Sequence, residues 1–387
     1  MRPRAFTIYR HTSSLCAGFS RGYSTKRPHF QDVFPNKKLV NRLLFEMDSK
    51  LTFSRLYPVY EAVYNSLEAP EVPGKCIPSS FKGEDVLMMK KVLEKLRHRT
   101  KTLNRNLVAL ESELLEKAAE LGDNDAIAAL AFQVLEKAEK NTPEDVTHAK
   151  KLIKTLYKMP HPLTIKLTAD LAFTKNDFVS AEKFYRKYLE LENDTYRAGE
   201  VSGKLGIINF KKPDLKAAEE YFLRSIRICP LEQVVQSYYY LAQLYMDSEP
   251  LKARCLMESA ASEGFKESFQ SLGFLEMNYF QNYAKALEWF KLGMELFDFQ
   301  CFIGYFDCSI KLESYQKAKK CLESMQTISK NNEMTQKSFD LFLSSRAKQI
   351  QALESRTTNV VTATNLYIQS DDLKSNSPPE KNDRWGL

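Results

Sequence analysis

The residues of this 387-residue chain that could do chemistry are few and lie apart. Cys301 and Cys308 are seven positions apart, which places both thiols on one face of a helix, and Cys321 follows in the next predicted helix. Zinc sites normally draw on closer ligand pairs, and the sequence has no C-x-x-C, no twin C-x9-C and no C-x3-C pattern. We interpret these cysteines as small buried apolar residues and predict no metal site.

Histidines and catalytic motifs offer no stronger candidate. His98, His148 and His161 have no nucleophilic residue at a meaningful spacing. The sequence lacks a G-x-x-x-x-G-K-[ST] phosphate loop, a G-x-G-x-x-G fingerprint, a G-x-S-x-G elbow and an H-E-x-x-H pair. The carboxylate pair Glu219-Glu220 falls on a predicted helix surface, where charge is ordinary. The prediction is a non-enzymatic protein without a cofactor.

The function that these residue types still allow is binding of a polypeptide by a surface of both apolar and polar side chains. Aromatic, methionine and amide side chains can hold an extended or helical segment, because apolar anchors supply affinity and polar groups supply orientation. A second interpretation stays open, in which most of these side chains pack against neighbouring helices. The candidate groove residues, on the first helices of two consecutive predicted hairpins, are Tyr239, Gln243, Met246, Asp247, Phe274, Met277 and Asn278.

A repeated helical hairpin would position this groove. Leu205-Gly206, Ala218, Phe222 and Pro230 stand at the offsets of the Leu-Gly pair, the small alanine, the aromatic residue and the closing proline of a tetratricopeptide repeat. Gly206 and Ala218 are small where two antiparallel helices approach closely. Phe222 fills the gap between neighbouring hairpins, and Pro230 stops the second helix.

One hairpin cannot bury its apolar face alone, so copies are expected. The first-helix signature recurs as Leu241-Ala242 and Leu272-Gly273, while the paired alanines before Gly264 and Gly122 resemble the related Sel1-type repeat. These features predict an all-α fold, a right-handed superhelical solenoid of antiparallel helix pairs. The small alanines of successive second helices, 32 to 37 residues apart, are Ala181, Ala218, Ala253, Ala286 and Ala318.

The N-terminus has the composition of a mitochondrial transit peptide. Its first 31 residues contain six Lys or Arg and no Asp or Glu, and Arg21-Gly22-Tyr23-Ser24 resembles a matrix-protease site. We predict that residues 1–23 are a transit peptide and that the mature chain starts near Ser24. A disordered basic arm that binds nucleic acid is the alternative.

The rest of the chain is nearly neutral. Six of its 56 Lys and Arg residues lie in the first 31 residues, which leaves 50 against 49 acidic residues in residues 32–387. Long-range attraction to nucleic acid is therefore not built into the body of the protein. No stretch approaches the roughly 18 to 20 apolar residues that cross a bilayer, so we expect at most attachment to a membrane surface.

Residues 24–83 are predicted to form a helical cap followed by a loop. Val40, Leu43 and Leu44 follow helical spacing beside basic residues, a second helix spans residues 57–67, and Pro and Gly in residues 69–83 indicate the loop. Two roles stay open for the first helix: it covers the end of the solenoid, or it lies on an anionic membrane.

Residues 84–353 are predicted to be the repeat domain. Thr142 before Pro143 is typical of a helix start, and a helix over residues 334–353 closes the array. Residues 354–387 are rich in Thr, Asn, Ser and Asp, so we predict a disordered polar tail.

Several segments resemble a small fungal family, over about residues 30 to 350. Among them are residues 118–128 (AAELGDNDAIA), 244–253 (LYMDSEPLKA), 264–283 (GFKESFQSLGFLEMNYFQNY) and 301–308 (CFIGYFDC). Members of that family are matrix-side tetratricopeptide proteins, peripheral to the mitochondrial inner membrane. They are needed to move the C-terminal tail of cytochrome c oxidase subunit 2 across it. The family supplies no catalytic or contact residues to carry over, and the tail from Glu354 departs from it.

The resemblance implies a chaperone-like scaffold for cytochrome c oxidase assembly. Its implied partners are subunit 2 and the inner-membrane insertion or export machinery, and its implied place is the matrix face of the inner membrane. No nucleic acid is expected as a partner. An RNA-binding helical-repeat factor for processing or translation of a mitochondrial mRNA remains the alternative, because such factors also use hairpins of about 35 residues.

Overall fold

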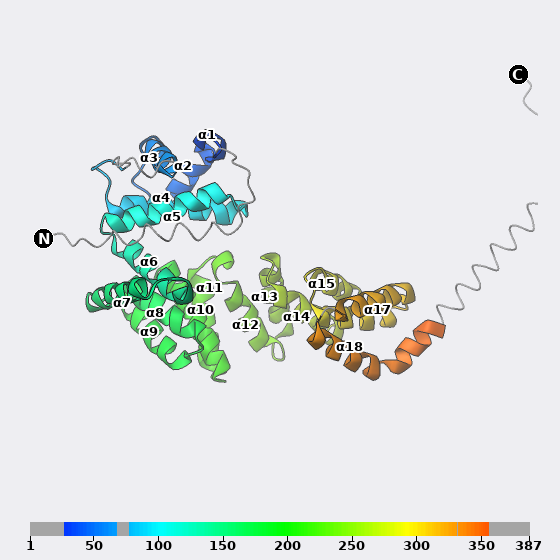
Figure 1. Ribbon diagram of the computed structural model, residues 1–387. Helices are drawn as coiled ribbons and strands as arrows, with labels where there is room; N and C mark the ends of the chain where they lie inside the picture. Colours follow the sequence, from blue (N-terminus) through cyan, green and yellow to red (C-terminus); the bar gives the residue numbers. More distant parts are fainter. Residues whose placement is uncertain (1–26, 68–76, 331, 356–387) are drawn as a thin grey trace, which may run out of the picture. The chain divides into compact units, whose positions relative to one another are not determined.

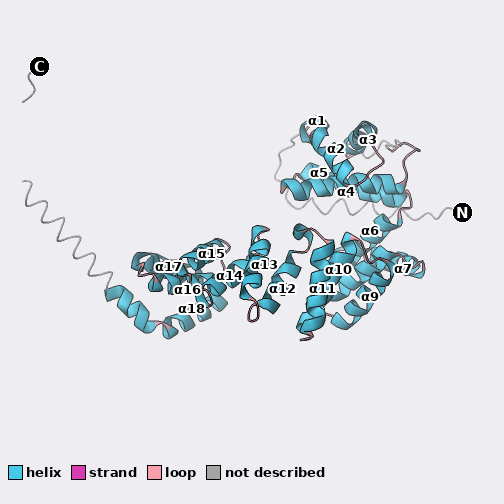
Figure 2. Cartoon of the chain, turned by 180° about the vertical axis from the view of Figure 1, so that it is seen from behind, coloured by secondary structure: helices cyan, strands magenta, loops and turns pink. Residues whose placement is uncertain are grey.

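The computed structural model describes residues 27–67, 77–330 and 332–355, and within these ranges every regular element is a helix (Figures 1 and 2). The prediction of an all-α fold of consecutive helix pairs is confirmed. The chain divides into two compact units, residues 1–193 and 194–387. The division falls inside the predicted repeat domain of residues 84–353, so the predicted domain boundaries stay a prediction.

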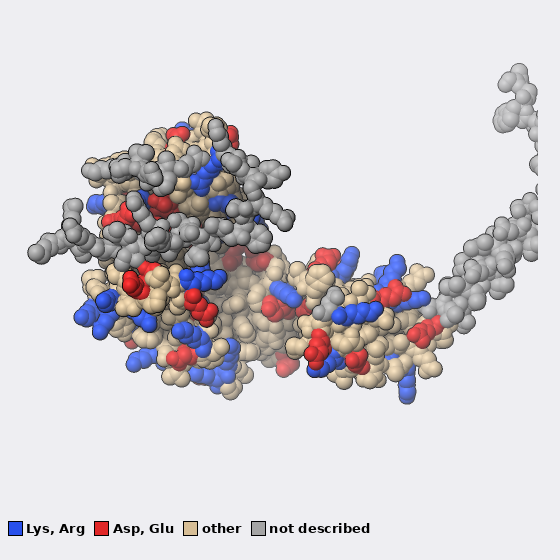
Figure 3. All heavy atoms as spheres, viewed as in Figure 1, with Lys and Arg blue, Asp and Glu red and all other residues tan. Residues whose placement is uncertain are grey.

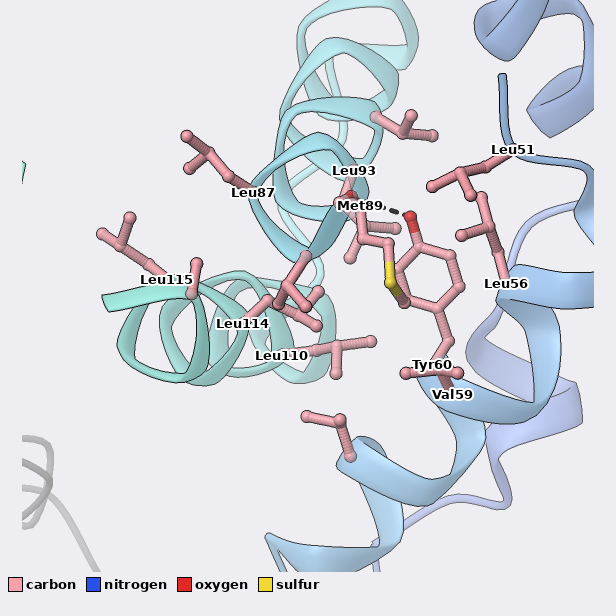
Figure 4. Close-up of a cluster of buried hydrophobic side chains, with 14 of the residues drawn as sticks. Leu51, Leu56, Val59, Tyr60, Leu87, Met89, Leu93, Leu110, Leu114 and Leu115 are labelled. Carbon is pink, nitrogen blue, oxygen red and sulfur yellow. Dashed lines mark hydrogen bonds between the residues drawn. The ribbon is translucent and has the colours of Figure 1, made fainter. Parts of the chain in front are cut away.

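The first unit begins with helices that share one core (Figure 4). Tyr60 crosses this core, and its hydroxyl donates a hydrogen bond to the Met89 carbonyl at 2.7 Å. The pairing removes the cost of burying the phenol oxygen. The helices are α1 (Phe30–Val33), α2 (Lys37–Glu46), α3 (Phe53–Ser66), α4 (Gly83–Thr100) and α5 (Arg105–Glu120).

The amphipathic helix predicted near residue 40 is α2, and its apolar face is used inside the protein. Val40, Leu43 and Leu44 are buried in the core that α2 shares with α3, α4 and α5. The helix therefore covers its neighbours with the face that would otherwise have been free to meet a membrane.

Four more helices complete the first unit. Thr142 accepts a hydrogen bond from the Asp145 backbone N–H at 3.2 Å, which confirms the predicted helix start at Pro143. Gly122, with φ +87°, follows the end of α5 in a conformation that favours glycine. The helices are α6 (Asn124–Glu136), α7 (Pro143–Lys158), α8 (Pro162–Thr174) and α9 (Phe178–Leu191), with a 3-10 turn, η2 (Ala138–Lys140), between α6 and α7.

The second unit consists of successive helix hairpins, in which each odd-numbered helix packs on the even-numbered helix before it. A 3-10 turn, η3 (Leu231–Gln233), lies between α11 and α12. The helices are α10 (Tyr196–Lys211), α11 (Leu215–Ile228), α12 (Val235–Tyr245), α13 (Pro250–Ser262), α14 (Lys266–Asn278), α15 (Tyr283–Glu295), α16 (Phe299–Lys311), α17 (Tyr315–Ser329) and α18 (Glu333–Ser345).

Small residues let aromatic rings enter the hairpins. A Cβ added to Gly206 would fall 2.5 Å from the ring of Phe222, so the glycine leaves room for that ring. Phe222 also stacks on Tyr240 of the next hairpin, with ring centroids 6.0 Å apart. The predicted role of Phe222 between hairpins is thus confirmed, and α11 ends at Ile228, just before Pro230.

The end of the array differs from the single helix expected over residues 334–353. Helix α18 ends at Ser345, and a further helical stretch occupies residues 347–355. Arg346 leaves the helical conformation where its guanidinium donates to both carboxylate oxygens of Asp307 on α16, at 2.7 and 2.6 Å. This bidentate pair ties the closing helix to the preceding hairpin.

The predicted leader, residues 1–23, lies outside the described residues. So does the predicted tail, except for Glu354 and Ser355. Among the helices that the structure describes, none has the length and apolarity to cross a membrane.

Candidate protein-binding surface

Tyr239 and Gln243 lie one helical turn apart on α12, and both are half-buried. The Tyr239 and Ser271 hydroxyl oxygens are 3.3 Å apart, and the Gln243 amide donates to Ser271 Oγ at 3.3 Å. Ser271 belongs to α14, so these three polar groups join two consecutive first helices. The sequence interpretation missed Ser271.

Three of the predicted groove residues also contribute to packing. Phe274 meets Phe290 edge to face, with ring centroids 5.0 Å apart, and Met277 packs on the same apolar cluster. Met246 packs on the cluster that contains Met257. Each of the three is half-buried, so part of its surface stabilises the fold and part faces solvent.

The two remaining candidates stand at helix ends. Asp247 follows the last turn of α12, and Asn278 is the last residue of α14. Both are exposed. The structure therefore brings Tyr239 and Gln243 together through Ser271.

A buried ion pair holds α14 in position. Glu276 is fully buried, and its Oε1 lies 2.8 Å from Nζ of Lys285 on α15. Lys285 also pairs with Glu258 of α13 at 2.9 Å. The carboxylates of Glu276 and then Glu258 raise the pKa of Lys285, so the lysine stays charged and links three consecutive helices.

A cleft of about 330 Å³ lies between α10 and the segment that leads into α12. Two of the residues that α10 contributes to the cleft occupy the same positions in their helix as Tyr239 and Gln243 occupy in α12. Gly203 and Ile207 stand three residues before and one residue after the small residue Gly206, and Tyr239 and Gln243 hold the same offsets in α12. Applying the offsets of Tyr239 and Gln243 to the preceding hairpin would have predicted this part of the cleft from the sequence. The lining residues are Glu200, Gly203, Lys204, Ile207, Glu232, Gln233, Val234, Val235, Gln236 and Ser237.

One of these lining residues, Ser237, is buried and pairs with a serine of α11. The Ser225 and Ser237 hydroxyls share a hydrogen bond of 2.9 Å, which pairs both groups away from water. A Cβ on Gly203 would fall 2.6 Å from Ser237 Oγ. Glycine is therefore required for α10 to approach this closely.

The electrostatic character of the surface is mixed. Burial, reinforced by a hydrogen bond that Tyr245 donates to Glu219, raises the pKa of Tyr245 to about 12. On the face of the repeats visible in Figure 3, Lys and Arg side chains are interspersed with Asp and Glu. This surface suits a polar polypeptide better than a polyanion.

The cysteines are placed as the sequence indicated. Cys301, Cys308 and Cys321 are buried, and burial raises the pKa of each thiol to about 12. Such thiols stay protonated near neutral pH and are poor nucleophiles. In the described part of the chain, no three His, Cys, Asp or Glu residues gather as metal ligands.

Several solved helical-repeat proteins resemble this chain at low identity. Pseudomonas aeruginosa pilF is 14% identical, with a TM-score of 0.44, over 55% of this chain and 95% of its own. The antigen c5321 of uropathogenic Escherichia coli, which displays an SLR fold, is 15% identical, with a TM-score of 0.40, over 90% of this chain and 88% of its own.

Sequence comparison identifies a much nearer relative. Residues 26–123 match the family model described as the MSS2 N-terminal domain. The Saccharomyces cerevisiae protein named "Protein MSS2, mitochondrial" is 42% identical over 331 residues, which is 84% of this chain and 94% of that protein. The predicted resemblance to a fungal mitochondrial family is confirmed. At this identity and over nearly the whole length of both proteins, the chain belongs to the MSS2 family.

Proposed function

We propose that this protein is a mitochondrial assembly factor that binds other proteins on the surface of its helical repeats. The observation that carries the proposal is the match over nearly the full length of a mitochondrial protein. The half-buried aromatic, amide and methionine side chains of α12 and α14, beside the cleft at α10, supply a surface for a polypeptide. We propose no enzymatic activity, since among the residues that the structure describes neither the buried thiols nor the histidines gather into a metal-binding or reactive cluster.

The finer proposal concerns cytochrome c oxidase. The protein acts on the matrix face of the inner membrane, peripherally attached. There it holds the newly made C-terminal domain of subunit 2, or the export machinery, while that domain crosses the membrane. A large polar domain crosses a bilayer only at high cost, because its hydrogen-bonding groups lose water. A helical scaffold that holds this domain close to the export machinery would therefore assist its passage.

The test labels mitochondrial translation products in cells that lack the protein and then treats mitoplasts with protease. Subunit 2 should be synthesised at the normal rate, while its C-terminal domain stays protected from the protease. Wild-type mitoplasts should lose that domain to the protease, which serves as the control. If subunit 2 is never made, the RNA-binding alternative replaces this proposal.

A second experiment locates the binding surface. A photoreactive residue at Tyr239 should crosslink to newly synthesised subunit 2 or to an export component, because that side chain is half-exposed on a first helix. The matched control is Lys291, which is exposed on the second helix α15. Equal crosslinking from Tyr239 and Lys291 would show that the partner does not bind specifically to the surface of the first helices.

A further inference from the structure

Two large apolar side chains in the first unit face solvent almost completely. Phe45, in the last turn of α2, is 87% exposed, although Leu43 and Leu44 beside it are buried. Leu103, between α4 and α5, is 75% exposed. The apolar face of α2 is already covered by the core, and Phe45 lies outside that core with most of its ring in solvent.

Ion pairs bring the surroundings of these two residues together. Glu46 Oε1 lies 2.8 Å from Nη1 of Arg99, and Glu46 Oε2 lies 3.4 Å from Nζ of Lys95. The pairs place the C-terminal ends of α2 and α4 side by side. Glu46 adjoins Phe45 in sequence, and Arg99 is four residues before Leu103.

The same two segments carry a large excess of positive charge. Within residues 37–50 and 95–105, the only acidic residues are Glu46 and Asp48, and Glu46 forms ion pairs with Arg42, Lys95 and Arg99. Hydrogen bonds from Arg99 and then the other two cations hold the pKa of Glu46 at about 2, so this match persists at neutral pH. The exposed basic residues of the segments are Lys37, Lys38, Arg42, Lys50, Lys95, Arg99, Lys101 and Arg105.

We propose that the C-terminal ends of α2 and α4, with the turn that carries Leu103, form a docking surface for an anionic phospholipid bilayer. Phe45 and Leu103 enter the interfacial layer, and the surrounding Lys and Arg side chains meet lipid phosphates. Apolar anchors within a basic ring are the combination by which monotopic proteins bind such membranes. A nucleic acid would use the basic residues and could stack on Phe45, but it has no use for an exposed aliphatic Leu103.

This surface belongs to the first unit, whereas the groove residues belong to the second. It deepens the peripheral membrane attachment that forms part of the proposed function, and it assigns that attachment to residues outside the apolar face of α2. Direct binding to lipid then needs no membrane-spanning partner.

The experiment measures flotation of the protein, purified from mitochondria in its natural processed form, with two kinds of vesicle. Vesicles of phosphatidylcholine with cardiolipin should bind it, vesicles of phosphatidylcholine alone should not, and salt should weaken the binding. In the Phe45→Ser/Leu103→Ser variant, partitioning onto the anionic vesicles should fall by about tenfold or more, because both apolar side chains that would be buried in the interfacial layer are lost. Lys50→Gln/Lys101→Gln, which removes two exposed cations beside the anchors, should lower it by a similar order.

The matched control is Met334→Ser/Leu341→Ser, which removes two equally exposed apolar side chains from α18 and should bind as the native chain does. Circular dichroism establishes that each variant is folded. Binding by the anchor variant equal to that of the native chain overturns the proposal, as does native binding to RNA but not to vesicles. Normal export of subunit 2 in cells that lack the protein, together with vesicle binding by the purified native chain, would refute the proposed function alone, because vesicle binding is measured without subunit 2.

Discussion

Glu116 on α5 illustrates how a single carboxyl can lower stability. Burial, together with the nearby charges of Glu113 and Glu120, raises its pKa to about 7 from an ordinary value of 4.5. Between these two pH values the folded state binds the proton more tightly than the unfolded state does. The stability of the first unit therefore decreases as pH rises through this window.

Replacing Glu116 with Gln should relieve this penalty. At pH 8 the variant should have a free energy of unfolding higher by on the order of 1–2 kcal/mol, a value reduced from the full shift because the side chain is partly solvated. Near pH 4 the native chain and the variant should coincide. Urea denaturation at the two pH values measures this. Glu139→Gln, at an exposed position, is the control, and an equal gain from both variants would contradict the explanation.

At the scale of elements, hairpins are joined by rings that enter spaces left by glycine. Phe290 of α15 is fully buried, and a Cβ on Gly273 of α14 or on Gly304 of α16 would fall 2.3 Å from its ring. One aromatic side chain thus fixes the spacing of three consecutive helices. Because the ring cannot retreat, neither position has room for a methyl group.

Gly273→Ala should consequently destabilise the second unit, although alanine is the better helix former. Overpacking costs roughly 1–3 kcal/mol, against a propensity gain of about 1 kcal/mol. In a Phe290→Leu background the same substitution should cost less than half as much, since the smaller side chain leaves space. A double-mutant cycle in guanidinium measures the coupling, and strictly additive effects would show that the ring does not set the helix spacing.

At the scale of the whole molecule, we propose that the basic residues 1–23 direct import and that the nearly neutral remainder of the chain binds partners. A chain lacking residues 1–23 should not enter isolated, energised mitochondria, because it loses four of the six leader cations on which the membrane potential acts. Protease protection after import measures this. Removing the last 23 residues is the length-matched control and should leave import unchanged; import of the chain without residues 1–23 would place the targeting signal elsewhere.

The sequence by itself determined the hairpins. The offsets from Gly206 to Ala218, Phe222 and Pro230 are local, and each reflects a steric requirement within one helix pair or between adjacent pairs. For that reason the all-α repeat fold, the helix start at Pro143 and the buried cysteines could be predicted residue by residue.

Only the tertiary structure decided which side chains remain on the surface. The link from Tyr239 and Gln243 to Ser271 and the cleft beside Gly203 depend on how consecutive first helices align, and no spacing within one helix specifies that alignment. Phe45 gives the clearest case. Helical periodicity places the neighbouring leucines of α2 on one apolar face. In the folded protein these leucines are buried against α3, α4 and α5, whereas Phe45 remains exposed to solvent. Exposure results from contacts between residues far apart in the chain, so it appears only when the helices are assembled.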